Sequence, residues 1–264
     1  MINHITIYLK RLFGYTVNKA LLPSFTADIF KPLRSAFEVP TLEQMEADII
    51  PYSPSAPEGR RVLVLAPHPD DETLGCGGSL ILLRERGAEI KVLFLTKGEK
   101  ADPTVKDPEE YAVIRQEEAM AALTTLGISD YRFLGHPDRG LYTNFHKCLQ
   151  DVKDCVSHYK PDTLYCPSPL ELNPDHRVAA TISVLLFREC KINIAFYEIS
   201  VPFRPNRLIT ITEVMDKKIE ALEAYRSQCK LINYVRLINA LNGFRSLTLN
   251  GCNGFVEAFY ILSH

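Results

Sequence analysis

The chain has 264 residues, of which 46% are hydrophobic and 23% charged, and its formal net charge is -2. This is the composition of a globular protein with enough chain to bury one large core. Its nearly balanced charge and scattered basic residues argue against a nucleic-acid partner. No stretch reaches the roughly 18 apolar residues that a membrane span needs, so we expect no transmembrane segment.

The cysteines bear on the compartment in which the protein works. There are seven, an odd number, and no C-x-x-C pair is present. This argues against a disulfide framework and against a structural zinc site built from cysteines. Free buried thiols in a reducing environment explain the pattern better, and the N-terminus lacks a signal-peptide cleavage pattern. We therefore expect a cytoplasmic protein.

Residues 1–57 differ from the rest of the chain, and we expect an N-terminal helical extension and linker there. Apolar residues from Ile2 to Phe13 recur at helical spacing with basic residues beside them. Two interpretations are open: a helix that binds a membrane surface or a partner, or a helix that packs on the main domain, which we favour. A Pro-rich segment from Pro51 to Pro57 then leads into the main domain, residues 58–264.

Strand and helix patterns alternate from Arg61 onward. Strands are predicted at 61–66, 89–95, 131–134, 163–166, 193–199 and 255–262, and helices at 74–86, 108–126, 142–159, 175–189, 213–225 and about 230–242. The repeated strand–helix order predicts an α/β fold, a Rossmann-like three-layer α/β/α sandwich with a mostly parallel sheet. Ligands bind such sheets beyond the carboxyl ends of the strands.

The residues that could carry chemistry gather after the first of these strands, in Ala66-Pro-His-Pro-Asp-Asp-Glu72. Three acids at the tip of a buried strand need a positive partner. His68 and Asp71, three residues apart across a turn, can bind one ion. A catalytic zinc site takes three protein ligands and an open position, and His176, at another strand-to-helix junction, is the best third ligand. Taken alone, His176 could equally be a surface histidine near a helix start.

Asp70 lies beside the candidate ligand Asp71 and could act as general base. It would take a proton from metal-bound water and return it to a leaving amine. The structural alternative is a helix N-cap, and Glu72 is expected to be structural. Gly75-Cys-Gly-Gly78 could cradle a phosphate, but the acid expected after the next strand is missing, which favours close helix packing instead.

Taken together, these residues resemble a known family. Ala66–Glu72 resembles the signature of the LmbE-like, or PIG-L, family of metal-dependent N-acetylglucosamine de-N-acetylases. Five further segments resemble other motifs of that family: Leu95-Thr-Lys-Gly98, Arg115-Gln-Glu-Glu-Ala119, Gly135-His-Pro-Asp-Arg-Gly-Leu141, Ser168-Pro-Leu-Glu-Leu-Asn-Pro-Asp-His-Arg177 and Ala221-Leu-Glu-Ala-Tyr-Arg-Ser-Gln228. The resemblance covers about residue 60 to about residue 260.

The resemblance implies roles for individual residues. It assigns one Zn²⁺ per chain to the three candidate ligands, the role of general base to Asp70, and sugar contacts to Arg115 and Asp138. The family often has a histidine where this chain has Asn173. An asparagine could donate a hydrogen bond to an oxyanion, but it cannot carry a proton.

Two other residues have open roles. His136, in a loop at a strand end, could substitute for the missing histidine, although an exposed loop histidine explains it more simply. Arg204 could bind a substrate hydroxyl or phosphate, and a structural role fits it equally well.

The leading hypothesis is a zinc-dependent hydrolase that removes the N-acetyl group from an N-acetylated amino-sugar conjugate. One alternative is a sugar-binding protein that keeps the metal site but has little turnover, which the asparagine at position 173 leaves open. A non-haem iron oxygenase is a further, less favoured alternative. It is considered because those enzymes also use two histidines and a carboxylate.

Overall fold

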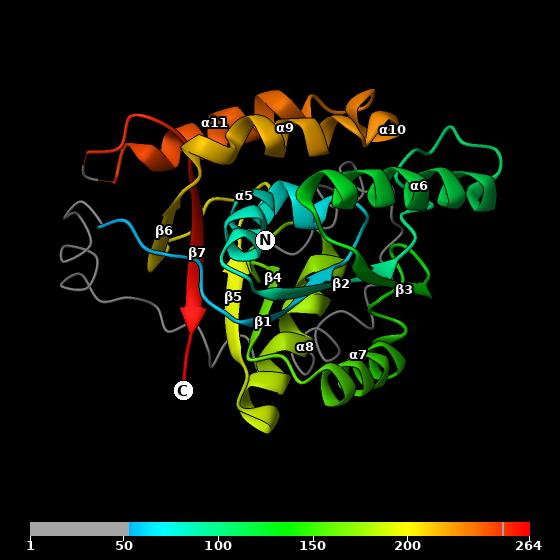
Figure 1. The fold of residues 1–264 in the computed structure, drawn as a ribbon. Helices are drawn as coiled ribbons and strands as arrows, with labels where there is room; N and C mark the ends of the chain where they lie inside the picture. The colour runs from blue at the N-terminus through cyan, green and yellow to red at the C-terminus, as the bar shows by residue number, and fades with distance from the viewer. Residues whose placement is uncertain (1–52, 250) are drawn as a thin grey trace, which may run out of the picture. The chain divides into compact units, whose positions relative to one another are not determined.

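A single sheet organises the computed structural model, which describes residues 53–249 and 251–264 (Figure 1). Its strands are β1 (Arg61–Ala66), β2 (Glu89–Thr96), β3 (Asp130–His136), β4 (Thr163–Pro167), β5 (Asn193–Tyr197), β6 (Arg207–Thr210) and β7 (Val256–Leu262). They are arranged in the order β3-β2-β1-β4-β5-β7-β6. The first five strands are parallel, whereas β7 is antiparallel to β5 and β6 is antiparallel to β7. The expected mostly parallel sheet is thereby confirmed.

Helices cover both faces of this sheet. They are α5 (Asp71–Glu85), α6 (Pro108–Leu126), α7 (Phe145–Tyr159), α8 (Pro174–Cys190), α9 (Met215–Glu223), α10 (Arg226–Cys229) and α11 (Tyr234–Ser246). On one face α5, α6 and α9 pack together and α11 lies against β7, while α7 and α8 lie on the other face (Figure 1). This is the three-layer α/β/α architecture that the alternating pattern predicts.

Local signals account for where the helices begin and end. The side chain of Asp107 accepts hydrogen bonds from the N–H groups of Glu109 and Glu110, and Gly127, with φ of 76°, ends α6 in a left-handed conformation. α6 therefore spans the predicted residues 108–126. α8 begins at Pro174 because the Asn173 side chain accepts a hydrogen bond from the N–H of the second helical residue.

Strands β1 and β4 form the centre of the sheet and position the candidate site. Residues 62–66 of β1 have no exposed surface. β1 lies beside both β2 and β4, so the strand order reverses direction at the β1–β4 pair. In open α/β sheets this switch point creates a crevice beyond the carboxyl ends of the strands. The connections leaving β1 and β4 carry His68 and His176, so both histidines come to this crevice.

Some elements differ from the sequence-based expectations. α5 begins at Asp71 instead of residue 74, and the helix expected at 230–242 is α11, preceded by the separate short α10. The strand β6 was not predicted. A 3₁₀ turn, Thr212–Val214, opens the helix expected at 213–225. The elements in this C-terminal part are short, so each holds too few residues for a clear periodic pattern.

The predicted extension, residues 1–57, lies outside the described residues except for its last five. Residues 53–57 form neither helix nor strand, and the N–H of Ser55 donates to the carbonyl of Leu208, at 2.8 Å. The boundary at residue 57 and the helix before it remain predictions. In the described part of the chain, every helix is too short or too polar to cross a bilayer.

Candidate active site

Three buried side chains converge at the switch point. Nδ1 of His68 lies 3.1 Å from Oδ2 of Asp71 and 3.2 Å from Nε2 of His176, and the last two atoms are 3.2 Å apart. His68 follows β1, Asp71 opens α5 and His176 lies in the first turn of α8. The structure therefore brings together the three residues that spacing and fold position indicated as metal ligands.

The geometry of this triangle fits a divalent metal ion. Ligands bound tetrahedrally at zinc distances of about 2.0–2.2 Å are separated from one another by roughly 3.3–3.6 Å. The three atoms here lie at almost that spacing, with two nitrogens and one carboxylate oxygen facing one point. Two histidines and one carboxylate also form the ligand set of catalytic zinc sites. The residues thus fit the ion that the motif implies.

The other ring nitrogen of His68 is engaged by acids. Its Nε2 lies 3.3 Å from Oδ1 of Asp138 and 3.4 Å from Oδ2 of Asp175. Histidine ligands of metals commonly donate their second N–H to a carboxylate, which fixes the tautomer and the ring orientation. Asp138 and Asp175 therefore leave Nδ1 free to coordinate. By contrast, Nδ1 of His176 is buried without a hydrogen-bond partner among the described residues.

The electrostatics of the cluster favour a bound cation. Burial lowers the pKa of His68, but the nearby carboxylates of Asp138, Asp175 and Asp71 outweigh burial and raise that pKa well above its usual value. For Asp71, burial acts to raise the pKa, and the two histidines overcome it and lower the pKa far below its usual range. The pocket therefore holds either protons or a metal ion, which compete for the same ligand atoms.

Asp175 joins three segments around His68. Its carboxylate accepts hydrogen bonds from the backbone N–H groups of Arg139, at 2.7 Å, and Leu141, at 3.2 Å. Asp138, in the same 137–141 loop, accepts from the N–H of Lys100 at 2.9 Å. The strand-end loops after β2 and β3 are thereby tied to the first turn of α8. The side chains of His68, Asp138 and Asp175 are themselves close enough to hold an ion. Because they meet at the second ring nitrogen of His68, we interpret this group as the one that orients His68.

Asp70 has an unusual backbone and a buried side chain. Its φ of 133° is rarely adopted by residues with a side chain, and only 4% of its surface is exposed. Although it occupies the N-cap position of α5, its side chain makes no capping hydrogen bond. Instead Oδ2 accepts from the hydroxyl of Tyr234, at 2.7 Å, and from Nη2 of Arg115, at 3.2 Å. The N-cap interpretation of this carboxylate is therefore wrong.

The candidate substrate residue Arg115 is enclosed beside Asp70. It is 1% exposed, and besides Asp70 its Nη2 also donates to the carbonyl of Pro69. Gly98 makes room for it, because a Cβ at Gly98 would lie 2.9 Å from Nε of Arg115. Nε and Nη1 of Arg115 are buried without hydrogen-bond partners in the described part of the chain. A contact between this arginine and a sugar remains a proposal.

The other candidates occupy distinct places. The side chain of Asn173 caps α8 by accepting from the N–H of Asp175 at 2.9 Å. Arg204 is half-buried in the connection between β5 and β6. His136 is buried, and its Nε2 lies 3.0 Å from the carboxylate of Asp151 on α7. His136 is thus not an exposed loop residue, and it is engaged away from the metal ligands.

The glycines that come after the motif serve close packing. A Cβ at Gly75 would lie 2.0 Å from the ring of Tyr197, and a Cβ at Gly78 would lie 2.7 Å from Ile211. α5 therefore approaches β5 and the segment after β6 more closely than any larger residue would allow. The phosphate-cradle alternative has no support, because these positions face protein side chains.

Two residues of the site were not assigned from sequence. Asp175 stands next to His176, and its position in Pro-Asp-His was the available signal that it could orient a ligand. Tyr234 opens α11, far along the chain from Asp70, and no motif marks it. Its contact depends on how the C-terminal helices fold back over the sheet.

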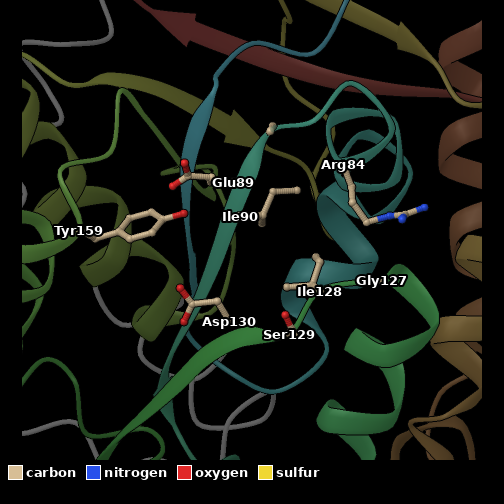
Figure 2. Close-up of a pocket in the computed structure, with 9 residues that line it drawn as sticks. Arg84, Glu89, Ile90, Gly127, Ile128, Ser129, Asp130 and Tyr159 are labelled. Carbon is tan, nitrogen blue, oxygen red and sulfur yellow. The ribbon is translucent and has the colours of Figure 1, made fainter.

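A separate hollow of about 300 Å³ lies at the amino-terminal ends of β2 and β3 (Figure 2). Arg84, Glu89, Asp130 and Tyr159 are among its lining residues. This is the sheet edge opposite the metal ligands, so the hollow takes no part in the candidate active site.

Comparison with protein families identifies the core of the chain. Residues 63–186 match the family model described as PIG-L, GlcNAc-PI de-N-acetylase. The match contains all three candidate metal ligands and Asp70. This segment, just under half of the chain, is therefore similar to the PIG-L family. β6, β7 and the helices α9 to α11 lie beyond the matched segment.

Individual relatives agree with this assignment. The chain is 28% identical over 187 residues to a probable N-acetyl-alpha-D-glucosaminyl L-malate deacetylase 2 of Bacillus anthracis, a match that covers 64% of this chain and 81% of that protein. Among solved structures, an N,N'-diacetylchitobiose deacetylase from Pyrococcus horikoshii superposes with a TM-score of 0.70 at 22% identity, over 85% of this chain and 94% of the other.

A second solved structure shows that the fold serves more than one reaction. GalB, a 4-carboxy-2-hydroxymuconate hydratase from Pseudomonas putida, superposes on this chain with a TM-score of 0.63 at 22% identity, over 78% of this chain and 97% of the other. Both superpositions are likenesses of fold. The activity of this chain has to be argued from its side chains.

Proposed function

We propose that this protein is a zinc-dependent hydrolase that removes the N-acetyl group from an N-acetylated amino-sugar conjugate. The observation that carries the proposal is the triangle of His68, Asp71 and His176 beside the carboxylate of Asp70, within the segment that is similar to the PIG-L family. Relatives named as deacetylases of such conjugates support the reaction and the substrate class.

The proposed roles follow from the geometry. Zinc held by the three ligands would lower the pKa of a water molecule to about 7 and polarise the amide carbonyl. Asp70 accepts the proton of the attacking water as the new C–O bond forms at the acetyl carbon. It then returns that proton to the nitrogen as the C–N bond breaks, releasing acetate and a free amine.

Other residues assist in this proposal. The capping bond fixes the amide of Asn173 through its oxygen, which leaves the amide nitrogen as a donor for the oxyanion. Arg115, Asp138 and Arg204 are proposed to contact the sugar conjugate. We also propose that the protein works in the reducing cytoplasm, because all seven of its cysteines are free thiols.

The decisive experiment is reconstitution followed by product analysis. Metal-free protein loaded with one equivalent of Zn²⁺ should release acetate from a panel of N-acetylglucosamine conjugates, including a malate conjugate and diacetylchitobiose. Asp70→Asn should bind the same amount of zinc and lose roughly 10²- to 10⁴-fold in kcat. Full activity in that variant would refute the role of Asp70.

The same experiment separates the alternatives. Calorimetric binding of a glycan without acetate release would identify a sugar-binding protein with little turnover. Oxygen consumption by the iron-loaded protein, again without acetate, would identify an oxygenase.

A further inference from the structure

The C-terminal helix α11 reaches the candidate base through one tyrosine. Tyr234 is the first residue of α11 and is 7% exposed, and its hydroxyl lies 2.7 Å from Oδ2 of Asp70. α11 belongs to the helical layer that covers one face of the sheet, outside the matched family segment (Figure 1). A residue from beyond the family match therefore contacts the centre of the site.

Asp70 needs such a contact because its backbone is strained. A residue with a side chain held at φ of 133° and ψ of -26° costs on the order of 1–3 kcal/mol and persists only when its surroundings hold it there. Its N–H donates to the carboxylate of Glu72 at 3.2 Å. Its side chain is held by Arg115 and Tyr234, and the bond to Tyr234 is the shorter of the two.

Both side-chain donors lie on the same carboxylate oxygen. Tyr234 and Arg115 both donate to Oδ2 of Asp70. Oδ2 is therefore occupied by the protein, and Oδ1 is the oxygen left to exchange a proton with a reactant. If the carboxylate rotated about its Cβ–Cγ bond, Oδ1 and Oδ2 would exchange places, and Oδ1 would no longer be the oxygen left for the reactant.

Tyr234 is itself rigidly placed. The side chain of Asn233 accepts from the N–H of Arg236 at 2.9 Å and so caps α11 immediately before the tyrosine. The N–H of Tyr234 donates to the carbonyl of Ile232, also at 2.9 Å. Burial raises the pKa of the phenol well above its usual value, so the hydroxyl remains a hydrogen-bond donor.

We propose that Tyr234 is a positioning residue: its hydroxyl fixes the carboxylate of Asp70 so that Oδ1 faces the reacting groups. This inference rests on the proposed function, because it assigns Tyr234 an effect on the turnover of that same site. It adds a requirement that the matched family segment does not contain, namely that α11 is docked over the site.

The test compares two buried tyrosines. Tyr234→Phe removes only the hydroxyl that contacts Asp70. The matched control is Tyr111→Phe, because Tyr111 on α6 is also 7% exposed and its hydroxyl accepts from Nε2 of Gln228, at 2.7 Å. We expect Tyr234→Phe to lose about tenfold in kcat, with KM within about twofold, and Tyr111→Phe to stay within about twofold in both.

Two further arms exclude a merely structural effect. In an Asp70→Asn background, Tyr234→Phe should change the residual kcat by less than about twofold, because the group it positions is already absent. Fluorotyrosine at position 234, which keeps the hydroxyl, should retain the parental kcat. An equal loss in both backgrounds, a loss with fluorotyrosine, or an unchanged kcat in Tyr234→Phe would overturn the proposal.

An arm without turnover separates this inference from the proposed function. In protein labelled with ¹³C-aspartate, the carboxylate resonance of Asp70, assigned by its loss in Asp70→Asn, should shift in Tyr234→Phe and stay in place in Tyr111→Phe. If the parent protein releases no acetate, the proposed function fails while this resonance still decides the inference. If the parent is active and the resonance does not move, the inference alone fails.

Discussion

The two ring nitrogens of His68 face different partners. Nδ1 points to the other candidate ligands, and Nε2 points to two carboxylates. Such outer partners orient a metal ligand, and losing one typically lowers metal affinity 10- to 100-fold. The family resemblance implies that Asp138 contacts the sugar, whereas its contact with His68 suggests that it orients this histidine. These are two roles that an experiment can separate.

Asp138→Asn distinguishes these roles. If Asp138 orients His68, the affinity for zinc should fall about 10- to 100-fold, and KM at saturating zinc should stay within about twofold. If it contacts the sugar instead, KM should rise while zinc affinity is unchanged. Competition with a chromogenic chelator measures the affinity. Asp151→Asn, which removes the carboxylate beside His136, is the matched control and should leave zinc affinity unchanged.

Glu72 leads to a prediction about pH. Burial raises the pKa of its carboxyl to about 7, against hydrogen bonds from Thr73 and Tyr225 that act to lower it. From about pH 4.5 to about pH 7 the folded chain therefore keeps a proton that the unfolded chain has lost. The free energy of unfolding should fall as pH rises through this window, because the unfolded state binds fewer protons.

The variant Glu72→Gln tests that prediction, since its side chain is neutral at every pH. Between about pH 4.5 and about pH 7, the free energy of unfolding of this variant should fall by roughly 3 kcal/mol less than that of the parent. Urea unfolding of metal-free parent and variant at several pH values measures the difference. Parallel pH profiles for the two proteins would show that Glu72 has no raised pKa.

At the scale of single residues, the sequence was informative where chemistry and spacing coincide. His68 and Asp71 stand three residues apart after a buried strand, and His176 stands at an equivalent junction, so their convergence could be predicted. The contact of Tyr234 could not, because helical periodicity does not say which residue of a late helix reaches the sheet edge. Asp175 was visible in the sequence, but only its loop contacts reveal its connection to His68.

At the scale of elements, boundaries were predictable where capping residues mark them. Asp107, Pro108 and Gly127 bracket α6, and its predicted limits match the structure. α5 begins three residues earlier than predicted, because the acidic run was interpreted as a turn. Its second acid is in fact the first helical residue, with a carboxylate that accepts from the N–H of His68. The short strand β6 carries too few residues for a periodic signal.

The packing of α5 gives an element-scale prediction. Gly75→Ala would place a Cβ 2.0 Å from the ring of Tyr197, so α5 must move and carry Asp71 with it. Overpacking of this kind costs about 1–3 kcal/mol in unfolding free energy, and the displaced ligand should weaken zinc binding. Chemical denaturation and zinc titration measure the two effects.

Gly77→Ala is the control within the same helix. The nearest atom to a Cβ at Gly77 is Cγ of Lys218, at 3.4 Å, which is ordinary van der Waals contact. Because alanine favours helix by about 1 kcal/mol over glycine, this variant should be as stable as the parent or more so. If Gly75→Ala behaved like Gly77→Ala, the close approach of α5 to β5 would not be a constraint.

At the scale of the whole molecule, alternation of strands and helices was enough to predict the layers and the parallel centre of the sheet. It was not enough to predict the antiparallel edge. β7 follows three helices and pairs with β5 in the opposite direction, and β6 pairs with β7. Strand direction at an edge depends on where a long connection returns, which is not encoded in the local pattern.

The metal ligands link parts of the chain that are far apart in sequence, so zinc should stabilise the whole domain. His68 and His176 are separated by 108 residues and belong to the connections after β1 and β4. An ion that binds only the folded state adds about 2.7 kcal/mol to the free energy of unfolding when its concentration is 100 times its Kd. Zinc should therefore raise the unfolding midpoint, and a chelator should reverse the rise. His176→Ala should show little response to either, whereas His136→Ala, which alters a histidine engaged with Asp151, should respond like the parent. Equal responses of the His176→Ala variant and the parent would show that zinc binds elsewhere on the protein.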